Sequence, residues 1–265
     1  MNNLTLIQAV KDQKPLVHNI TNQVVMNFSA NGLYAIGAQP VMAHAREEVV
    51  EMASNANALV LNIGTLTGEL VDSMILAGQA ANKKGTPVVL DPVGVGATHF
   101  RTEAAKRIID TVQLTAIRGN AGEISQLAGI DAEVRGVDAT GEIDRIEVAK
   151  KAQRELDIPI IVTGETDVIV TEEKCLELNN GTPLMTQVTG TGCLLTAVVA
   201  AFLSVSETTL DGLVAAVSFY TIAAEVAAQT VTSPGSFQVA FLDALSEVGI
   251  DDCQKRLQII REERS

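Results

Sequence analysis

The chain has 265 residues, of which 47% are hydrophobic, and this length and composition permit one large buried α/β core, so we expect a single domain spanning residues 1–265. Its formal net charge is -13 and its Lys and Arg residues form no basic run, so binding to nucleic acid through counterion release is not expected. It contains no Trp and 3% aromatic residues, and its apolar stretch 193–203 is shorter than a bilayer requires, so we expect neither base stacking nor a membrane span.

Short β-branched segments alternate with longer stretches of helical periodicity along the first two thirds of the chain. Expected strands lie at residues 15–20, 39–43, 58–64, 87–92, 115–120 and 159–164. Expected helices lie between them, at residues 23–35, 46–53, 69–84, 102–111, 121–129 and 144–157. This alternation predicts repeated βα units around a mostly parallel central sheet that is flanked by helices.

The pattern changes after residue 164. From Asp167 the chain has two short strand patterns joined by a polar turn at Glu172 and Glu173, which predicts an antiparallel hairpin at the sheet edge. Ala-rich helical stretches follow at residues 192–203, 209–230 and 236–248. Their low charge predicts burial against the sheet or against each other. The charged tail, residues 253–265, is expected to form a last helix or strand, and we assign it no function.

The cysteine pattern and the N-terminal sequence indicate the cellular compartment in which the protein is expected. Cys175, Cys193 and Cys253 are far apart and show no CxxC spacing, so neither a disulfide framework nor a zinc site is predicted. The N-terminus has no basic segment followed by a sustained apolar run, so no export signal is expected. A reducing cytoplasm is the predicted location.

Polar clusters follow six of the expected strands, at the edge where ligands bind in open α/β sheets. They are HNITN, NIGT, DPVGVG, RGNAGE, TGE and TGTGC, which begin at residues 18, 62, 91, 118, 163 and 189. Any one of these clusters is ordinary turn chemistry. Six of them on one edge predict a binding site.

Several common sites are absent from the sequence. It contains no Gly-Lys pair, no complete GxGxxG and no GxSxG, which argues against a Walker A loop, a standard dinucleotide site and a hydrolase elbow. His18, His44 and His99 lack metal-ligand spacing. Anion chemistry at a glycine turn with nearby acids is the interpretation that remains.

The stretch VTGTGCLLTA places that glycine turn where an apolar helix begins, and the free N–H groups and dipole of a helix N-terminus favour a phosphate. Cys193 could accept a proton from an attacking hydroxyl if it is a thiolate, and a helix N-terminus is a setting that lowers a thiol pKa. It could equally be a small buried hydrophobe. Asp91 and Glu123 could hold hydrated Mg²⁺ near the phosphates, or serve as a helix cap or a surface charge.

Together VHNITN, PVMA, LDPVGVGAT, RGNAGEI and VTGTGC closely resemble the hydroxyethylthiazole kinases of the ribokinase-like superfamily, from about Leu4 to Val248. The resemblance implies a ribokinase-like three-layer fold. It also implies transfer of the γ-phosphate of ATP to the primary alcohol of 4-methyl-5-(2-hydroxyethyl)thiazole, a step of thiamine salvage. A homotrimer with active sites between its subunits is implied as well.

Eight residues match the functional positions of this family. The resemblance implies Cys193 as the base; Asn22, Met42 and Gly190 in the substrate pocket; Arg118 and Thr163 as ATP contacts; and Asp91 and Glu123 as residues that organise Mg²⁺ through water. Most of the superfamily has aspartate at the position of Cys193, so the cysteine marks the thiazole branch.

Three alternatives stay open. The first is a ribokinase-like kinase for another small alcohol, such as hydroxymethylpyrimidine or pyridoxal. The second is an ATP-dependent NAD(P)HX dehydratase, which shares the fold but usually has aspartate at the base position. The third is a nucleotide-binding sensor that has no turnover.

Overall fold

The described part of the chain, residues 3–130 and 144–264 of a computed structural model, forms nine strands in one sheet. The strands are β1 (Leu16–Ile20), β2 (Gln39–Val41), β3 (Ala58–Asn62), β4 (Val88–Asp91), β5 (Ala116–Asn120), β6 (Ile160–Thr163), β7 (Asp167–Val170), β8 (Lys174–Leu178) and β9 (Ile259–Arg264). Their order in the sheet is β2-β1-β3-β4-β5-β6-β7-β8-β9. Strands β1 to β6 pair in parallel, which confirms the predicted mostly parallel sheet.

The predicted antiparallel edge is also present. Strand β7 pairs antiparallel with both β6 and β8, and Glu172 and Glu173 lie in the turn between β7 and β8. The charged tail forms both a helix and a strand, because α11 (Ile250–Arg256) is followed by β9, which pairs antiparallel with β8. Residue 265 of the tail lies outside the described part.

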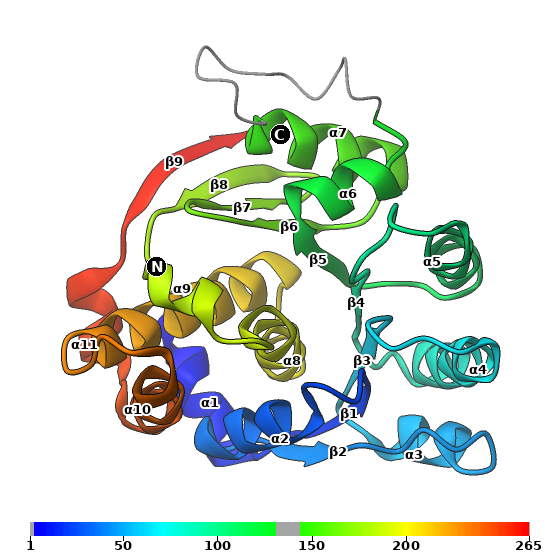
Figure 1. The fold of residues 1–265 in the computed structure, drawn as a ribbon, viewed down its shortest axis with the longest axis horizontal. Coiled ribbons are helices and arrows are strands. Elements are labelled where there is room, and N and C mark those ends of the chain that lie inside the picture. The colour runs from blue at the N-terminus through cyan, green and yellow to red at the C-terminus, as the bar shows by residue number, and fades with distance from the viewer. Residues whose placement is uncertain (1–2, 131–143, 265) are drawn as a thin grey trace.

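Helices cover both faces of the sheet, so the molecule has three layers. The remaining helices are α1 (Leu6–Gln13), α2 (Met26–Ala35), α3 (Val49–Asn55), α4 (Gly68–Lys84), α5 (His99–Thr111), α6 (Ala121–Leu127), α7 (Arg145–Leu156), α8 (Thr191–Leu203), α9 (Thr209–Ala228) and α10 (Pro234–Glu247), with short 3₁₀ helices at Asn3–Thr5 and Pro183–Gln187. Figure 1 shows the strands in an arc around α8 and α9, with α3, α4 and α5 on its outer side.

The central strands, such as β3 and β4, are buried on both faces, as expected for a parallel sheet between helix layers, whereas the edge strand β2 is half-exposed. In β3, Leu59 and Leu61 pack into the core under α3 to α7, whereas Val60 packs into the core under α1, α2 and α8 to α10. This alternation decides the side on which each polar residue at a strand end lies. Asn62 continues the alternation and therefore faces α8.

Some predicted helix boundaries are wrong by two or three residues. Helix α5 begins at His99 rather than at residue 102, because the Thr98 hydroxyl accepts a hydrogen bond from the backbone N–H of Arg101 and caps the helix. Helix α10 begins at Pro234 rather than at residue 236, and proline suits the first helical turn. Helices α2 and α3 also start three residues later than predicted.

Helices α8 and α9 are buried as predicted, whereas α10 buries one face and leaves the other exposed, as at Val239. Helix α9 is long and apolar enough to span a membrane by length and composition, but 78% of its apolar window is buried inside the protein. Its Tyr220 ring packs edge-on against Phe241 of α10, with ring centroids 4.9 Å apart. These contacts are those of a central core helix.

Candidate active site

The glycine turn lies at the start of α8, as the sequence predicts. Gly190 is the N-cap residue of α8, and its φ of 90° is left-handed, a conformation that favours glycine. A Cβ at Gly190 would lie 2.8 Å from Cγ1 of Val25, so the absence of a side chain also permits this close approach. Thr191 and Gly192, which begin the helix, line a large cavity.

A row of polar side chains crosses the sheet at the C-terminal ends of β3, β4 and β5. Asn62 and Asp91 are paired in the register of β3 and β4, and the Asn62 Nδ2 donates to Asp91 Oδ2 at 2.7 Å. The Arg118 Nη1 lies 3.8 Å from Asp91 Oδ1, and its Nη2 donates to Thr163 Oγ1 at 2.6 Å. These side-chain contacts therefore bring three of the predicted site residues, Asp91, Arg118 and Thr163, into one row.

Asp91 is fully buried in this row. Its Oδ2 accepts a second hydrogen bond, 3.0 Å long, from Thr196 Oγ1 in α8. Burial raises the pKa of Asp91 above its usual value and the nearby Glu123 carboxylate adds to the rise, whereas the Arg118 guanidinium lowers this pKa. A cation or a positively charged ligand near Asp91 would favour its ionised form.

Cys193 joins the row through Asn22. The Asn22 Nδ2 donates to Asn62 Oδ1 at 2.8 Å and lies 3.5 Å from the Cys193 sulfur. Burial and, to a smaller extent, the Asp91 carboxylate raise the pKa of the Cys193 thiol to about 11, and together they outweigh the hydrogen bonds from Asn62 and Asn22 and the Arg118 guanidinium. The prediction of a lowered thiol pKa is therefore wrong, since removal from water outweighs the helix N-terminus, and Cys193 is a neutral thiol at pH 7.

Glu123 acts as a helix cap, which was one of the two interpretations of this residue. Its Oε2 accepts from the backbone N–H of Asn120 and the Asn120 Oδ1 accepts from the N–H of Glu123, a capping box at the start of α6. Its Oε1 accepts from the N–H of Gly94, at 2.9 Å. These bonds hold the half-buried carboxylate near Asp91 and leave lone pairs on both of its oxygens.

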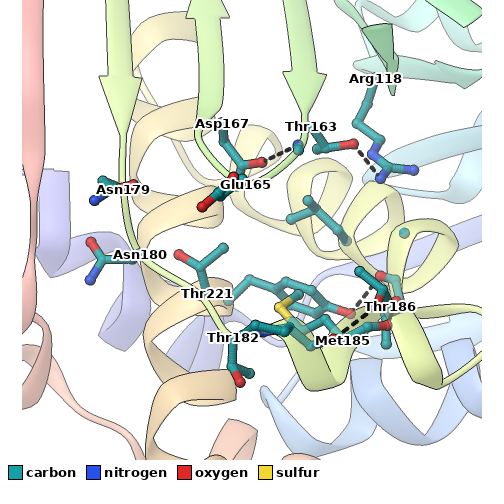
Figure 2. Close-up of a pocket in the computed structure, with 17 residues that line it drawn as sticks. Arg118, Thr163, Glu165, Asp167, Asn179, Asn180, Thr182, Met185, Thr186 and Thr221 are labelled. Carbon is teal, nitrogen blue, oxygen red and sulfur yellow. Dashed lines mark hydrogen bonds between the residues drawn. The ribbon is translucent and has the colours of Figure 1, made fainter. Parts of the chain in front are cut away.

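A cavity of about 690 Å³ opens beside the row, between β6, the loop after β8, and helices α8 and α9. Figure 2 shows Asp167, Thr163 and Arg118 along one side and Thr182 and Met185 along the other. A cavity of this size suits a small ligand or cofactor. Arg118 and Thr163, the predicted ATP contacts, both line it.

The structure adds residues that sequence reasoning missed. Asn62 belongs to the NIGT cluster but had no predicted role, and Thr196 had a usable signal because it lies one helical turn after Cys193. Asp167 lines the cavity, and burial raises its pKa to about 6, although the Gly164 N–H donates to Oδ1 of its carboxylate at 3.0 Å. Nothing in the sequence indicates that this aspartate is buried.

Met42 is not part of this chain of contacts among the described residues. It directly follows β2 at the edge of the sheet and is half-buried. The next residue is held to β1, since the fully buried His18 donates from Nε2 to the Ala43 carbonyl at 2.7 Å. Met42 therefore lies on an anchored segment.

The acidic residues of the site can be assessed as ligands for Mg²⁺. Among the described residues no cluster of three or more His, Cys, Asp or Glu could hold a metal ion. Mg²⁺ in kinases, however, is usually bound by one or two carboxylates together with substrate phosphates and water. The buried Asp91 Oδ1 makes no hydrogen bond to any described residue, and Glu123 lies nearby, so these two acids fit that mode.

Comparisons with known proteins agree with this geometry. A model of the hydroxyethylthiazole kinase family matches residues 7–251. The structure of hydroxyethylthiazole kinase from Pyrococcus horikoshii OT3 is similar over 98% of both chains, with 40% sequence identity and a TM-score of 0.90. A Bacillus subtilis pyridoxal kinase in complex with ADP, at 20% identity over 80% of this chain and 92% of that one, has a TM-score of 0.59.

A ribokinase-like protein from Enterococcus faecalis shares 16% identity, with a TM-score of 0.62 over 89% of this chain and 88% of that one. The last two similarities concern the fold alone, and they confirm that it is ribokinase-like. The match to the family model and the 40% identity extend over nearly the whole chain. The chain therefore belongs to the hydroxyethylthiazole kinase family and is a phosphotransferase with the ribokinase-like fold.

Proposed function

We propose that this kinase transfers the γ-phosphate of ATP to the primary alcohol of 4-methyl-5-(2-hydroxyethyl)thiazole at the junction of Cys193, Asp91 and Arg118. The observation that carries the proposal is the continuous chain of contacts from Cys193 through Asn22 and Asn62 to Asp91 and Arg118, at the edge of a cavity. The proposed site then has two halves, an acceptor half that binds the alcohol and a nucleotide half that binds ATP, and they meet at Asp91.

The nucleotide half is the cavity. The triphosphate would lie between Arg118 and the first N–H groups of α8, because both favour an anion and Arg118 is the one basic residue among the described residues that line the cavity. Thr163, whose hydroxyl accepts from Arg118, would lie beside the nucleotide. The base and ribose would fill the remainder of the cavity, away from Arg118.

The acceptor half comprises Asn22, Met42 and Gly190. Met42 would lie against the thiazole ring, and Gly190 would let the backbone approach the hydroxyethyl arm. Asn22 would bind the acceptor with its amide, since it is 4% exposed and already lies beside the sulfur of Cys193. The alcohol oxygen would then lie next to that sulfur.

The proposed reaction is an in-line displacement. The alcohol oxygen forms a bond to the γ-phosphorus, the bond from that phosphorus to the β,γ-bridging oxygen breaks, and the hydroxyl proton passes to the Cys193 thiolate as ADP leaves. With a pKa of about 11, only about one Cys193 in 10⁴ is a thiolate at pH 7. Catalysis would therefore depend mainly on positioning and electrostatics, as is usual for phosphoryl transfer.

Asp91 and Glu123 would hold hydrated Mg²⁺ against the phosphates. The ion would supply charge neutralisation for the transferring group. The chain's own part is to keep both carboxylates in place, through Asn62 and Thr196 for Asp91 and through the capping box for Glu123.

We further propose that the chain acts as one kinase domain in a cytoplasmic homotrimer, with each active site near a subunit boundary. One sheet connects all the described strands, which supports a single domain. The exposed Val24, two residues after Asn22, supports a subunit contact near the acceptor half. The spacing of the cysteines in the sequence supports the compartment.

A coupled kinase assay over a panel of primary alcohols tests the substrate. We expect the highest kcat/KM for hydroxyethylthiazole. A higher kcat/KM for hydroxymethylpyrimidine or pyridoxal would replace the proposed acceptor. Tight ATP binding without turnover of any alcohol would instead indicate a nucleotide sensor.

A further inference from the structure

The turn after β3, residues 62–65 (NIGT), contains no predicted site residue, yet it lies between the two halves of the site. Asn62 is 1% exposed. Its Oδ1 accepts from Asn22 Nδ2 at 2.8 Å and from the Gly64 N–H at 3.0 Å, and its Nδ2 donates to Asp91 Oδ2 at 2.7 Å. One amide therefore connects an acceptor-side residue with a nucleotide-side residue.

Backbone N–H groups fix the direction in which the side-chain amides of Asn62 and Asn22 point. The Gly64 N–H can only donate, so the Asn62 oxygen faces it and the Asn62 nitrogen faces Asp91. The Val24 N–H donates to Asn22 Oδ1 at 3.1 Å, so the Asn22 nitrogen faces Asn62 and Cys193. An N–H donor, and not a carbonyl, is thus presented beside the Cys193 sulfur.

Gly64 provides the space that Asn22 occupies. A Cβ at position 64 would lie 2.7 Å from both Cβ and Nδ2 of Asn22, a distance that requires a displacement. Gly64 has no left-handed φ, so alanine there would cause no backbone strain. The requirement for glycine is therefore room for one side chain of the acceptor half.

The turn is itself anchored. The Arg101 side chain of α5 donates from Nη1 to the Ile63 carbonyl at 2.8 Å and from Nη2 to the Gly64 carbonyl at 2.6 Å. The Thr65 hydroxyl accepts from the backbone N–H of Gln23 at 3.1 Å, next to Asn22. The Arg101 guanidinium on one side and the hydrogen bond between Thr65 and Gln23 on the other hold the turn in one position.

We propose that the turn formed by residues 62–65 is a positioning element, in which Asn62 and Gly64 set the amide of Asn22 against the acceptor alcohol and connect it to Asp91. The inference rests on the proposed function, because it takes Asn22 as an acceptor-binding residue and Asp91 as a nucleotide-side residue. Neither Asn62 nor Gly64 would touch the reacting atoms, so both are positioning residues.

The variant Gly64→Ala tests the positioning of Asn22. Its methyl group displaces Asn22, so we expect the KM for hydroxyethylthiazole to rise about tenfold, the effect of roughly one lost hydrogen bond, with little change in the KM for ATP. Gly68→Ala is the matched control, since a Cβ at position 68, the first residue of α4 shortly after this turn, meets nothing within 4 Å. The variant Asn22→Ala gives the size of the full effect.

The variant Asn62→Asp tests the connection to Asp91. Its carboxylate can still accept from Asn22 and Gly64, but it places a second carboxylate against Asp91. We expect the KM for hydroxyethylthiazole to stay within about twofold of wild type, while kcat falls by about tenfold or more. An equal rise of both KM values with kcat unchanged would overturn the connection.

The outcomes separate this inference from the proposed function. If Asn22→Ala raises the KM for hydroxyethylthiazole and Gly64→Ala does not, the turn does not position Asn22 and the inference is wrong. If Asn22→Ala itself leaves that KM unchanged, Asn22 is not an acceptor residue, and the proposed function fails first. Thermal unfolding of each variant shows that it is folded, and Asn62→Asp decides the question should Gly64→Ala fail to fold.

Discussion

Burial of ionisable groups sets the chemistry of individual residues in this site. Asp91 and Cys193 both have raised pKa values because they are removed from water, and the nearby Arg118 opposes the shift of each. Asp167 belongs to the same group, with a pKa of about 6 and an exposed fraction of 5%. Sequence reasoning could propose Asp91 and Cys193 from their motifs. It could not predict their acid strength, because this depends on burial.

The stability of the Asp167→Asn variant tests this effect of burial. Folding raises the pKa of the Asp167 carboxyl. Its favourable contribution to the free energy of unfolding is therefore fully present below about pH 3.8, the pKa in the unfolded chain, and is lost as the pH rises through about 6, the pKa in the folded protein. Asparagine removes the charge and keeps an oxygen for the Gly164 N–H. At pH 7.5 we expect a gain of about 1 to 3 kcal/mol in the free energy of unfolding, which disappears near pH 4.

Urea denaturation at the two pH values measures this difference. The exposed Asp243→Asn, on α10, is the control and should change stability little at either pH. An Asp167→Asn variant with the same stability as wild type at pH 7.5 would contradict the assigned effect of burial.

Most secondary-structure elements could be predicted from the sequence, because β-branched runs and helical periodicity are local signals. The alternation of strands and helices and the edge hairpin at Asp167 are examples. Helix starts such as His99 were harder, since they depend on the cap at Thr98. The contact of Asn62 with Asp91 was not predictable, because it depends on the register of β3 against β4.

Helix α8 begins beside the guanidinium of Arg118. A Cβ at Gly192 would lie 2.5 Å from Nη1 of Arg118, so Gly192→Ala must displace the guanidinium from the head of the cavity. We expect the KM for ATP to rise about tenfold or more with little change in the KM for hydroxyethylthiazole, because a contact to a charged group is lost.

Steady-state kinetics with each substrate varied in turn distinguishes the two constants. Gly235→Ala in α10 is the control, since a Cβ there meets nothing within 4 Å. If Gly192→Ala binds ATP as wild type does, the phosphates do not lie between Arg118 and α8.

The sequence is least informative about the assembly of the chain into an oligomer. The resemblance implies a trimer, but abundant apolar residues alone do not separate a core from a subunit contact. In the fold, Val24 and Tyr34 are 65% and 64% exposed; Val24 lies two residues after Asn22, and Tyr34 lies near the other end of α2, the helix that follows. Exposed apolar side chains beside a site favour a contact surface there.

Sedimentation tests the trimer. We expect a mass three times the 28.0 kDa of the chain. Tyr34→Glu introduces a charge into the expected contact and should lower both the mass and the activity, most strongly at low protein concentration. Phe100→Glu on α5, 49% exposed and on the opposite face of the sheet, should change neither. A wild-type chain that sediments as a monomer at full activity would contradict a shared site.

If the Cys193 sulfur accepts the proton of the alcohol, the pH dependence of kcat should differ between wild type and Cys193→Asp. With a thiol pKa of about 11, wild-type kcat should rise from about pH 7 to about pH 10 without a plateau. An aspartate carboxyl has an ordinary pKa well below 7 and needs no deprotonation at neutral pH, so Cys193→Asp should be active with a flat profile. A flat wild-type profile, with Cys193→Ala retaining full kcat, would contradict proton transfer to Cys193.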